Sequence, residues 1–289
     1  MKNKKGKVGI LVIALGRYTE FWAELFTSCE KYFLPNFQKE YYIFTDSENL
    51  KYKNRNNVHQ IYQKKLGWPF DTMMRFDMFL SQKAELQKLD YLYFLNINLV
   101  CRKVVGEEIL PTEINDGLMV CSHPGYYNRP RQLFPYDNNP NSTAYIPPNH
   151  GTHYAPGGFN GGTSKAFLEL AEICSKNVHI DLSKNIIATW HDESHLNKYI
   201  LDKKPLIMPI NYMYPKAAKW LAKDNIYDKN IKMELREKVN YGGHYYLRGL
   251  TDIKNTKFNK LKYKLLRKLS SSKEEYDKYT QILKMLYFG

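Results

Sequence analysis

Short apolar runs that alternate with segments of helical spacing constrain the fold of this chain more than any other feature. The first run covers residues 8–15 (VGILVIAL), and comparable runs follow at 40–46, 58–63 and 91–95. Between them, residues 21–29 and 71–88 carry apolar side chains three or four positions apart, which predicts helices. Strands that are apolar on both faces and alternate with helices favour a parallel sheet covered on both sides. We therefore predict an α/β fold with a mostly parallel central sheet flanked by helices.

The middle of the chain has a different composition. Residues 123–163 are dense in Pro, Gly, Asn and Tyr and end in GGFNGG (157–162), which we interpret as loop leading into a helix at Thr163. Regular structure is expected to resume with a helix over 164–176 and another over most of 186–201. A long, loop-rich insert in an α/β protein is usually functional, so we expect ligand contacts in this region.

The C-terminal segment is strongly basic. The chain carries a formal charge of +14, and residues 231–289 hold 14 Lys and Arg against 6 Asp and Glu. Leucines 261, 265, 266 and 269 share one helical face with Lys and Arg opposite, so residues 251–289 are predicted to form a basic amphipathic helical tail behind a single domain, 1–250. Such a charge points to a polyanion: nucleic acid, acidic lipid or a phosphorylated ligand. With no nucleic-acid motif recognised, an anionic membrane surface is the preferred partner and nucleic acid is not expected.

Cysteine usage and the N-terminus indicate the compartment. The four cysteines are far apart in sequence and form no CxxC pair, as in reduced, buried thiols of a cytoplasmic protein. The start resembles a signal peptide, with a basic segment before an apolar run, but no small-residue cleavage site follows. We therefore expect a cytoplasmic protein, peripheral at the inner face of the membrane through its tail.

Three stretches carry chemistry, and each is ambiguous by itself. NIN (96–98) ends the strand predicted at 91–95, where open α/β sheets bind ligands, but two asparagines after a strand are also common turn residues. WHDESHLN (190–197) spaces two histidines like a zinc protease motif without its glutamate, or is a solvated helix start whose acids complement the dipole. GGFNGG allows close backbone approach to a ligand but lacks the spacing of a phosphate-binding loop.

Taken together, these stretches resemble one family. The order EYYIFTD, MMR, FLNIN, HPGYY, STAYIP, GGFNGG and WHDESHLNKY is similar to that of the family 6 retaining glycosyltransferases, which include the histo-blood-group A and B transferases and the α-1,3-galactosyltransferase. The resemblance spans about residues 8–250 and implies a GT-A-type nucleotide-sugar transferase fold with a loop-rich acceptor region. It also implies a hexosyltransferase whose substrates are a UDP-sugar and an oligosaccharide acceptor.

The resemblance assigns roles to individual residues. Glu193 matches the catalytic carboxylate, as nucleophile or as stabiliser of an oxocarbenium-like state, and front-side attack by the acceptor is equally compatible. The positions that match donor-binding residues are Ile13, Leu15, Tyr18, Arg75, Asn96, Asn98, Gly157, Gly158, Asp192, Lys238 and Arg248. Those that match acceptor-binding residues are His123, Tyr126 and Trp190.

The asparagine pair also implies something about metal. In the family this strand end normally carries DxD, whose carboxylates hold Mn²⁺ against the UDP diphosphate, whereas this chain resembles the bacterial, metal-independent NxN branch. Amide oxygens are poor ligands for a hard divalent ion, so no metal and no cofactor are expected. Arg248 and Lys238 are the candidates for the counter-charge; the alternative is that they are surface bases of a basic tail.

Donor choice depends on Gly158, which stands where the A transferase has Gly and the B transferase has Ala. Glycine leaves room for an N-acetyl group, so UDP-GalNAc is preferred to UDP-Gal. The predicted reaction transfers GalNAc to the 3-hydroxyl of an acceptor galactose, α-1,2-fucosylated in the family expectation, with the α configuration retained. The rival hypotheses are the same reaction with UDP-Gal, or a non-catalytic carbohydrate-binding or nucleic-acid-binding protein.

Overall fold

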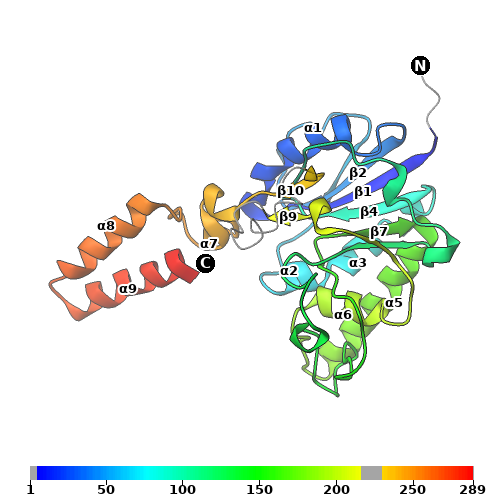
Figure 1. Cartoon of the computed structure of the whole chain (residues 1–289). Helices are drawn as coiled ribbons and strands as arrows, with labels where there is room; N and C mark the ends of the chain where they lie inside the picture. The colour runs from blue at the N-terminus through cyan, green and yellow to red at the C-terminus, as the bar shows by residue number, and fades with distance from the viewer. Residues whose placement is uncertain (1–4, 216–229, 289) are drawn as a thin grey trace.

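A seven-stranded sheet forms the centre of the molecule (Figure 1). The computed structural model describes residues 5–215 and 230–288. The strand order is β3-β2-β1-β4-β7-β6-β8, and among the described pairs of this sheet only the two made by β7 are antiparallel. The prediction of a mostly parallel central sheet is therefore confirmed. The strand bounds are β1 Lys7–Ile13, β2 Gln38–Thr45, β3 Val58–Tyr62, β4 Tyr91–Leu95, β6 Leu118–Cys121, β7 Phe159–Thr163 and β8 Leu206–Met208.

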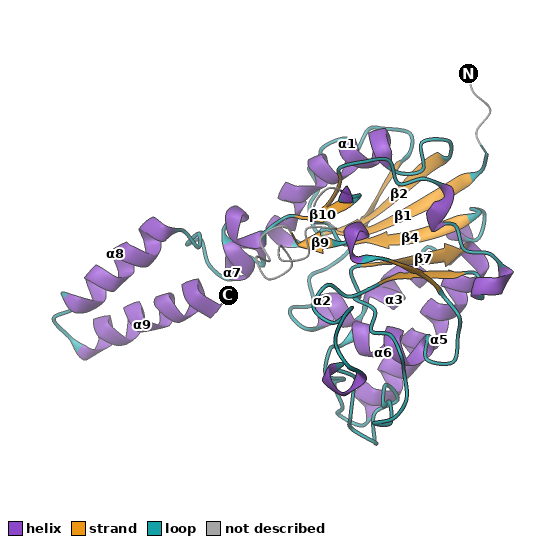
Figure 2. Cartoon of the chain, viewed as in Figure 1, coloured by secondary structure: helices purple, strands orange, loops and turns teal. Residues whose placement is uncertain are grey.

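Helices cover both faces of this sheet (Figure 2). Helix α1 (Trp22–Tyr32) lies on one face, and α3 (Arg75–Leu80), α5 (Ser164–Ser183) and α6 (Asp192–Tyr199) lie on the other. Successive side chains of β1 point to opposite faces of the sheet and pack against the helices on each face. Residues 8, 10 and 12 pack with α1, while Leu11 packs with α3 and α5. The apolar N-terminal run is thus a central strand; residues 1–4 of the basic segment before it lie outside the described residues.

The glycine-rich segment is a strand, and its interpretation as loop is wrong. Residues 159–163 form β7 between β4 and β6. A Cβ on Gly161 would lie 2.2 Å from Tyr93 Cδ1, and one on Gly162 would lie 2.2 Å from the carbonyl oxygen of Gly117. The glycines therefore give neighbouring strands room to approach, a role that strand propensities do not reveal.

Three helix predictions need correction in extent. The segment 71–88 is not one helix but three short ones: α2 (Phe70–Met73), α3 and α4 (Lys83–Leu86). The segment 186–201 forms an α-helix only from Asp192 to Tyr199. His191 has a φ of 53°, which is not a helical conformation, so the helix cannot extend back through this residue. Helix α5 is longer than predicted and begins after Thr163, whose side chain accepts a hydrogen bond from the Ala166 N–H.

A second, small sheet brings the C-terminal part of the chain to the end of β4. Strand β5 (Leu99–Cys101) follows β4 closely and pairs antiparallel with β10 (Met233–Leu235), which also pairs with β9 (Tyr214–Pro215). After β10 come the 3₁₀ helix η7 (Lys238–Tyr241) and helix α7 (Gly243–Leu247). The other 3₁₀ helices of the described residues are η1 Gly16–Phe21, η2 Glu107–Ile109, η3 Glu113–Asn115, η4 Arg131–Leu133 and η5 Ile210–Tyr212.

The C-terminal segment forms two helices, α8 (Lys257–Lys268) and α9 (Lys273–Phe288), which pack side by side and project away from the sheet (Figure 1). Its helical character was predicted; a domain boundary at residue 250 stays a prediction. The four cysteines are free and buried, and the sulfur atoms of Cys29 and Cys101 lie 3.9 Å apart. Within the described ranges, no helix combines the length and the apolar composition that crossing a bilayer requires.

Candidate active site

A cavity lies where β1 and β4 end. These strands are parallel neighbours, with Leu11 opposite Phe94, so the residues that follow them meet at one edge of the sheet. The space between the lining atoms is about 700 Å³, part of it open to solvent. Seven of the predicted donor-binding residues line it: Ile13, Leu15, Tyr18, Arg75, Asn96, Lys238 and Arg248.

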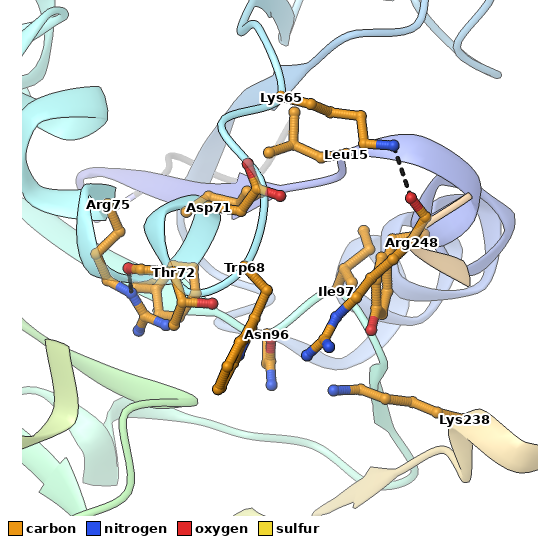
Figure 3. Close-up of a pocket in the computed structure, with 13 residues that line it drawn as sticks. Leu15, Lys65, Trp68, Asp71, Thr72, Arg75, Asn96, Ile97, Lys238 and Arg248 are labelled. Atoms are coloured by element: carbon orange, nitrogen blue, oxygen red, sulfur yellow. Dashed lines mark hydrogen bonds between the residues drawn. The ribbon is translucent and has the colours of Figure 1, made fainter. Parts of the chain in front are cut away.

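Two cations converge in this cavity. The ammonium of Lys238 and the guanidinium of Arg248 end in the same space, which the side chain of Asn96 also enters (Figure 3). Neither cation forms an ion pair with a carboxylate of the described residues. Burial, with a smaller effect of the Arg248 charge, lowers the pKa of Lys238 to about 8. Two like charges held together with no carboxylate of the described residues to neutralise them favour an anion between them.

Neighbouring groups orient the cations without neutralising them. The Tyr18 ring lies 5.5 Å from the Lys238 ammonium, and its hydroxyl oxygen is 3.3 Å from Nδ1 of His244. Burial and the charges of Lys238 and Arg248 lower the pKa of His244 to about 4, so this histidine is neutral near pH 7. The positive charge here therefore comes from the lysine and arginine side chains.

Lys65 and Trp68 are cavity residues that sequence reasoning missed. The Lys65 ammonium donates a 2.6 Å hydrogen bond to the backbone oxygen of Arg248, and the Arg248 guanidinium lies 5.4 Å from the centre of the Trp68 ring. Both belong to the loop after β3, a strand parallel to β2 and β1. Their position at the cavity could therefore have been predicted from the rule that loops at the carboxyl ends of parallel strands form the binding site.

The two asparagines of NIN have different positions. Asn96 lines the cavity, and its backbone N–H donates to the Gly158 carbonyl oxygen at 2.8 Å. Asn98 is buried and is not a lining residue; its amide nitrogen donates to the backbone oxygen of Arg236 at 2.8 Å, and its Oδ1 has no partner among the described residues. Asn98 thus ties the end of β4 to the segment that carries Lys238, and only Asn96 faces the ligand space.

Arg75 connects the cavity to a buried carboxylate pair. Its guanidinium donates to the Gly157 carbonyl oxygen at 2.6 Å and lies 2.9 Å from Oδ2 of Asp192, which is 2% exposed. Burial raises the pKa of Asp192 to about 7; Arg75 opposes this increase and Glu193 adds to it. The interpretation of these acids as a solvated helix start is wrong, because α6 carries them into the protein interior.

Glu193 accepts two hydrogen bonds that fix its carboxylate. The Tyr154 hydroxyl donates to one oxygen at 2.5 Å, and the Gly157 N–H donates to the other at 2.7 Å. Burial raises the pKa of Glu193 against these two bonds and Arg75, which lower it. A Cβ on Gly157 would lie 2.8 Å from Asp192 Oδ2, so glycine is needed where the backbone passes between the two acids and Arg75.

An aromatic cluster adjoins this carboxylate. Two of the predicted acceptor-binding residues, His123 and Tyr126, have ring centres 5.5 Å and 5.2 Å from that of Tyr154. His123 accepts a hydrogen bond at Nδ1 from Gly125, and burial lowers its pKa to about 4, which leaves a neutral ring with Nε2–H as donor. The third, Trp190, is placed by a 2.9 Å bond from its backbone N–H to Ser194 Oγ, with the indole half exposed. Tyr154 is a third residue that sequence reasoning missed.

The donor set at the strand end does not suit a divalent cation. Of the two asparagines only Asn96 faces the cavity, and Asp71, its one lining carboxylate among the described residues, accepts the N–H groups of Leu66 and Gly67. No group of three or more His, Cys, Asp or Glu side chains in the described part of the chain is arranged to hold a metal. The histidines of WHDESHLN do not share a helix face, because His191 packs on Trp68 before α6 begins while His195 is buried 3.8 Å from Asp181.

Cations at the carboxyl edge of an α/β sheet, with a buried carboxylate pair beside them, fit the transfer of a sugar from a nucleotide. This arrangement on an α/β sheet defines the class of the protein as a glycosyltransferase with the GT-A-type fold. The sequence matches the model described as glycosyltransferase family 6 over residues 1–238. The chain belongs to this family, and it is a hexosyltransferase.

Similarity to individual relatives covers most of the chain. The chain is 38% identical over 223 residues to the O-antigen biosynthesis glycosyltransferase WbnI of Escherichia coli, and the match covers 75% of this chain and 94% of the relative. It is 34% identical over 241 residues to globoside alpha-1,3-N-acetylgalactosaminyltransferase 1 of Gallus gallus, covering 78% and 68%. It is 32% identical over 211 residues to histo-blood group ABO system transferase 1 of Rattus norvegicus, covering 71% and 59%.

Proposed function

We propose that the protein is a retaining α-1,3-N-acetylgalactosaminyltransferase that needs no divalent metal. It breaks the bond between the anomeric carbon and the diphosphate of UDP-GalNAc and forms a bond to the 3-oxygen of an α-1,2-fucosylated galactose, which loses its hydroxyl proton. The observation that carries the proposal is the pair of unpaired cations, Lys238 and Arg248, that face Asn96 where relatives with DxD hold a metal. In this reaction they stabilise the departing UDP, and Glu193 stabilises or attacks the anomeric carbon.

The donor preference rests on Gly158 and on the printed names of two relatives. A Cβ at position 158 would lie 2.4 Å from Met213 Cε and 3.4 Å from Asn96 Nδ2, so alanine at this position would displace the Met213 side chain and crowd Asn96. Relatives from chicken and human are named alpha-1,3-N-acetylgalactosaminyltransferases. UDP-Gal as the donor is the alternative, with the same residues in the same roles.

A donor screen in excess EDTA tests the proposal. Purified protein stripped of metal is given UDP-GalNAc or UDP-Gal with fucosylated or plain galactosides, and the products are identified by mass and by the anomeric coupling in NMR. We expect transfer from UDP-GalNAc at an undiminished rate, with an α linkage to the 3-position. Activity that appears only when Mn²⁺ is added back would contradict the metal-independent mechanism, and faster transfer from UDP-Gal would reverse the donor assignment.

The pH profile of kcat/KM for the donor should be a narrow bell. Activity is expected to fall below about pH 7, because the pKa of Asp192 is raised and its carboxylate becomes protonated. It should also fall above about pH 8, because Lys238 loses its proton and with it the charge that binds diphosphate. In the pH profile of kcat at saturating donor, the alkaline limb should move to higher pH, because the bound diphosphate stabilises the charged form of Lys238.

Lys238→Arg isolates the alkaline limb of this bell. Because a guanidinium stays protonated to well above pH 10, the variant should keep activity at pH 9 while the wild type loses it. An unchanged alkaline limb in Lys238→Arg would show that another group titrates there.

A further inference from the structure

Helix α8 exposes an apolar stripe to solvent. Phe258, Leu261, Leu265 and Leu269 recur three or four residues apart on one face, and they are 74%, 68%, 56% and 70% exposed. None of the described residues covers this stripe. A contiguous row of large apolar side chains on a projecting helix usually marks a binding surface.

The packing of α8 on α9 makes the exposure unusual. A helical hairpin in water is stabilised most when its most apolar faces meet between the helices. Here tyrosines and the stems of long bases lie between them: the rings of Tyr263 and Tyr279 are 6.1 Å apart, and Lys260 lies 4.8 Å from the Tyr287 ring. The leucines point away from α9, so they are free to contact something outside the chain.

The charges beside the stripe identify the partner. Helix α8 contains six bases and no acid in KFNKLKYKLLRK. At 100° per residue, Lys257, Lys264 and Lys268 lie along one border of the apolar stripe, and Lys262 lies on the other. An apolar stripe bordered by bases is the pattern of a helix that lies in the interface of an anionic bilayer.

We infer that α8 binds a membrane surface that contains anionic lipid, with its stripe (Phe258, Leu261, Leu265 and Leu269) in the acyl boundary and its lysines at the headgroups. A second copy of this helix is a poorer partner, because it would bring six bases against six. Nucleic acid would match the charge but would leave the leucines in water. Lipid accounts for both features, and this binding is independent of the proposed transfer reaction.

Vesicle binding by the full-length protein tests the inference. We expect partition onto phosphatidylcholine vesicles with 30% phosphatidylglycerol to be at least ~100-fold stronger than onto pure phosphatidylcholine, and to fall as salt rises. Leu261→Gln with Leu265→Gln should weaken it ~10- to 100-fold. Lys257→Gln with Lys262→Gln and Lys268→Gln should weaken it ~100-fold on the anionic vesicles alone.

Matched controls come from exposed residues elsewhere. Ile114→Gln removes an exposed apolar side chain from η3, and Lys165→Gln with Lys176→Gln and Lys184→Gln removes three exposed charges from α5 and its end. Both should bind vesicles like the wild type. All variants should also keep transfer to a soluble acceptor, so loss of transfer and loss of lipid binding are separate results.

Four outcomes would overturn the inference. These are equal binding to neutral and anionic vesicles, insensitivity to salt in the wild type, leucine variants that bind like the wild type, and tighter binding to RNA or DNA in anisotropy titrations. A dimer in sedimentation that Leu265→Gln dissociates would assign the stripe to a second copy instead. Point variants are used rather than deletion, because Leu286 of α9 is buried and lines a small pocket with Gly243 and Tyr245 of α7, the helix that precedes Arg248.

Discussion

Replacing Glu193 with glutamine is expected to lower kcat by ~10³-fold or more, with little change in affinity for UDP. The carboxylate lies next to Gly157 and Asp192, away from Lys238 and Arg248, so the nucleotide loses no contact. The neutral amide removes the negative charge that faces a developing oxocarbenium ion, where a water-excluded site makes charge most effective. Single-turnover transfer and UDP binding by calorimetry measure the two effects separately. Ordinary turnover in Glu193→Gln would remove this residue from the chemistry.

Tyr154→Phe is the matched control for this variant. Glutamine can accept only one of the two hydrogen bonds that Glu193 accepts, so part of the loss comes from disturbed positioning. Tyr154→Phe removes one of these bonds and keeps the charge, and its loss in kcat should be about tenfold. A loss equal to that of Glu193→Gln would mean that position, not charge, explains the glutamine variant.

Azide separates two roles of the carboxylate that the geometry leaves open. If Glu193 is a nucleophile, Glu193→Ala in azide should release a β-configured glycosyl azide, because the small anion occupies the vacated face. If it only stabilises positive charge, no such product should accumulate.

Arg248→Ala and Lys238→Ala are each expected to lower kcat by ~10²-fold, and the double variant by ~10³-fold or more. A cation about 4 Å from a phosphate oxygen contributes about 4 kcal/mol at an effective dielectric of 20, before the cost of desolvation. Because the two side chains end in the same space, each partly compensates for loss of the other (Figure 3). Affinity for UDP should fall with kcat, which distinguishes these variants from Glu193→Gln.

The control for the cation variants is Lys184→Gln, which removes an exposed base after α5 and should leave kcat unchanged. Added guanidinium ion should restore part of the activity of Arg248→Ala and have no effect on the control. Wild-type kcat in Arg248→Ala and Lys238→Ala would support the alternative that both are surface bases of a basic tail.

The sheet was predictable because its strands are apolar on both faces. Residues 8–15 and 91–95 are continuous apolar runs, the pattern typical of buried parallel strands. Strand β7 was not, because its sequence FNGGT contains an asparagine and two glycines, which disfavour strands, and it is held by the approach of Tyr93 and Gly117. This distinction is physical: local composition predicts a strand only where its own side chains provide the stabilisation.

The site was partly predictable for a similar reason. Positions after strands are placed by topology, so Asn96 and Ile13 were expected at the cavity. Asn98 was expected there too. Because the chain turns after Leu95, the side chain of Asn98 does not follow that of Asn96 into the cavity, and it donates to the Arg236 backbone oxygen instead. Tyr154 could not be found, because its bond to Glu193 depends on the packing of a loop that shows no periodicity.

The pairing of β10 with β5 has a consequence for biosynthesis. Lys238 and Arg248 follow this ladder in the chain, and the ladder, in which Glu234 lies opposite Val100, helps to bring their segment to the end of β4. A nascent chain that has emerged as far as β8 could assemble the whole seven-stranded sheet with both acids in position, yet it would lack the cations that receive the diphosphate. Catalytic competence would then arise late in translation, as a long-range contact closes, and not with the collapse of the core.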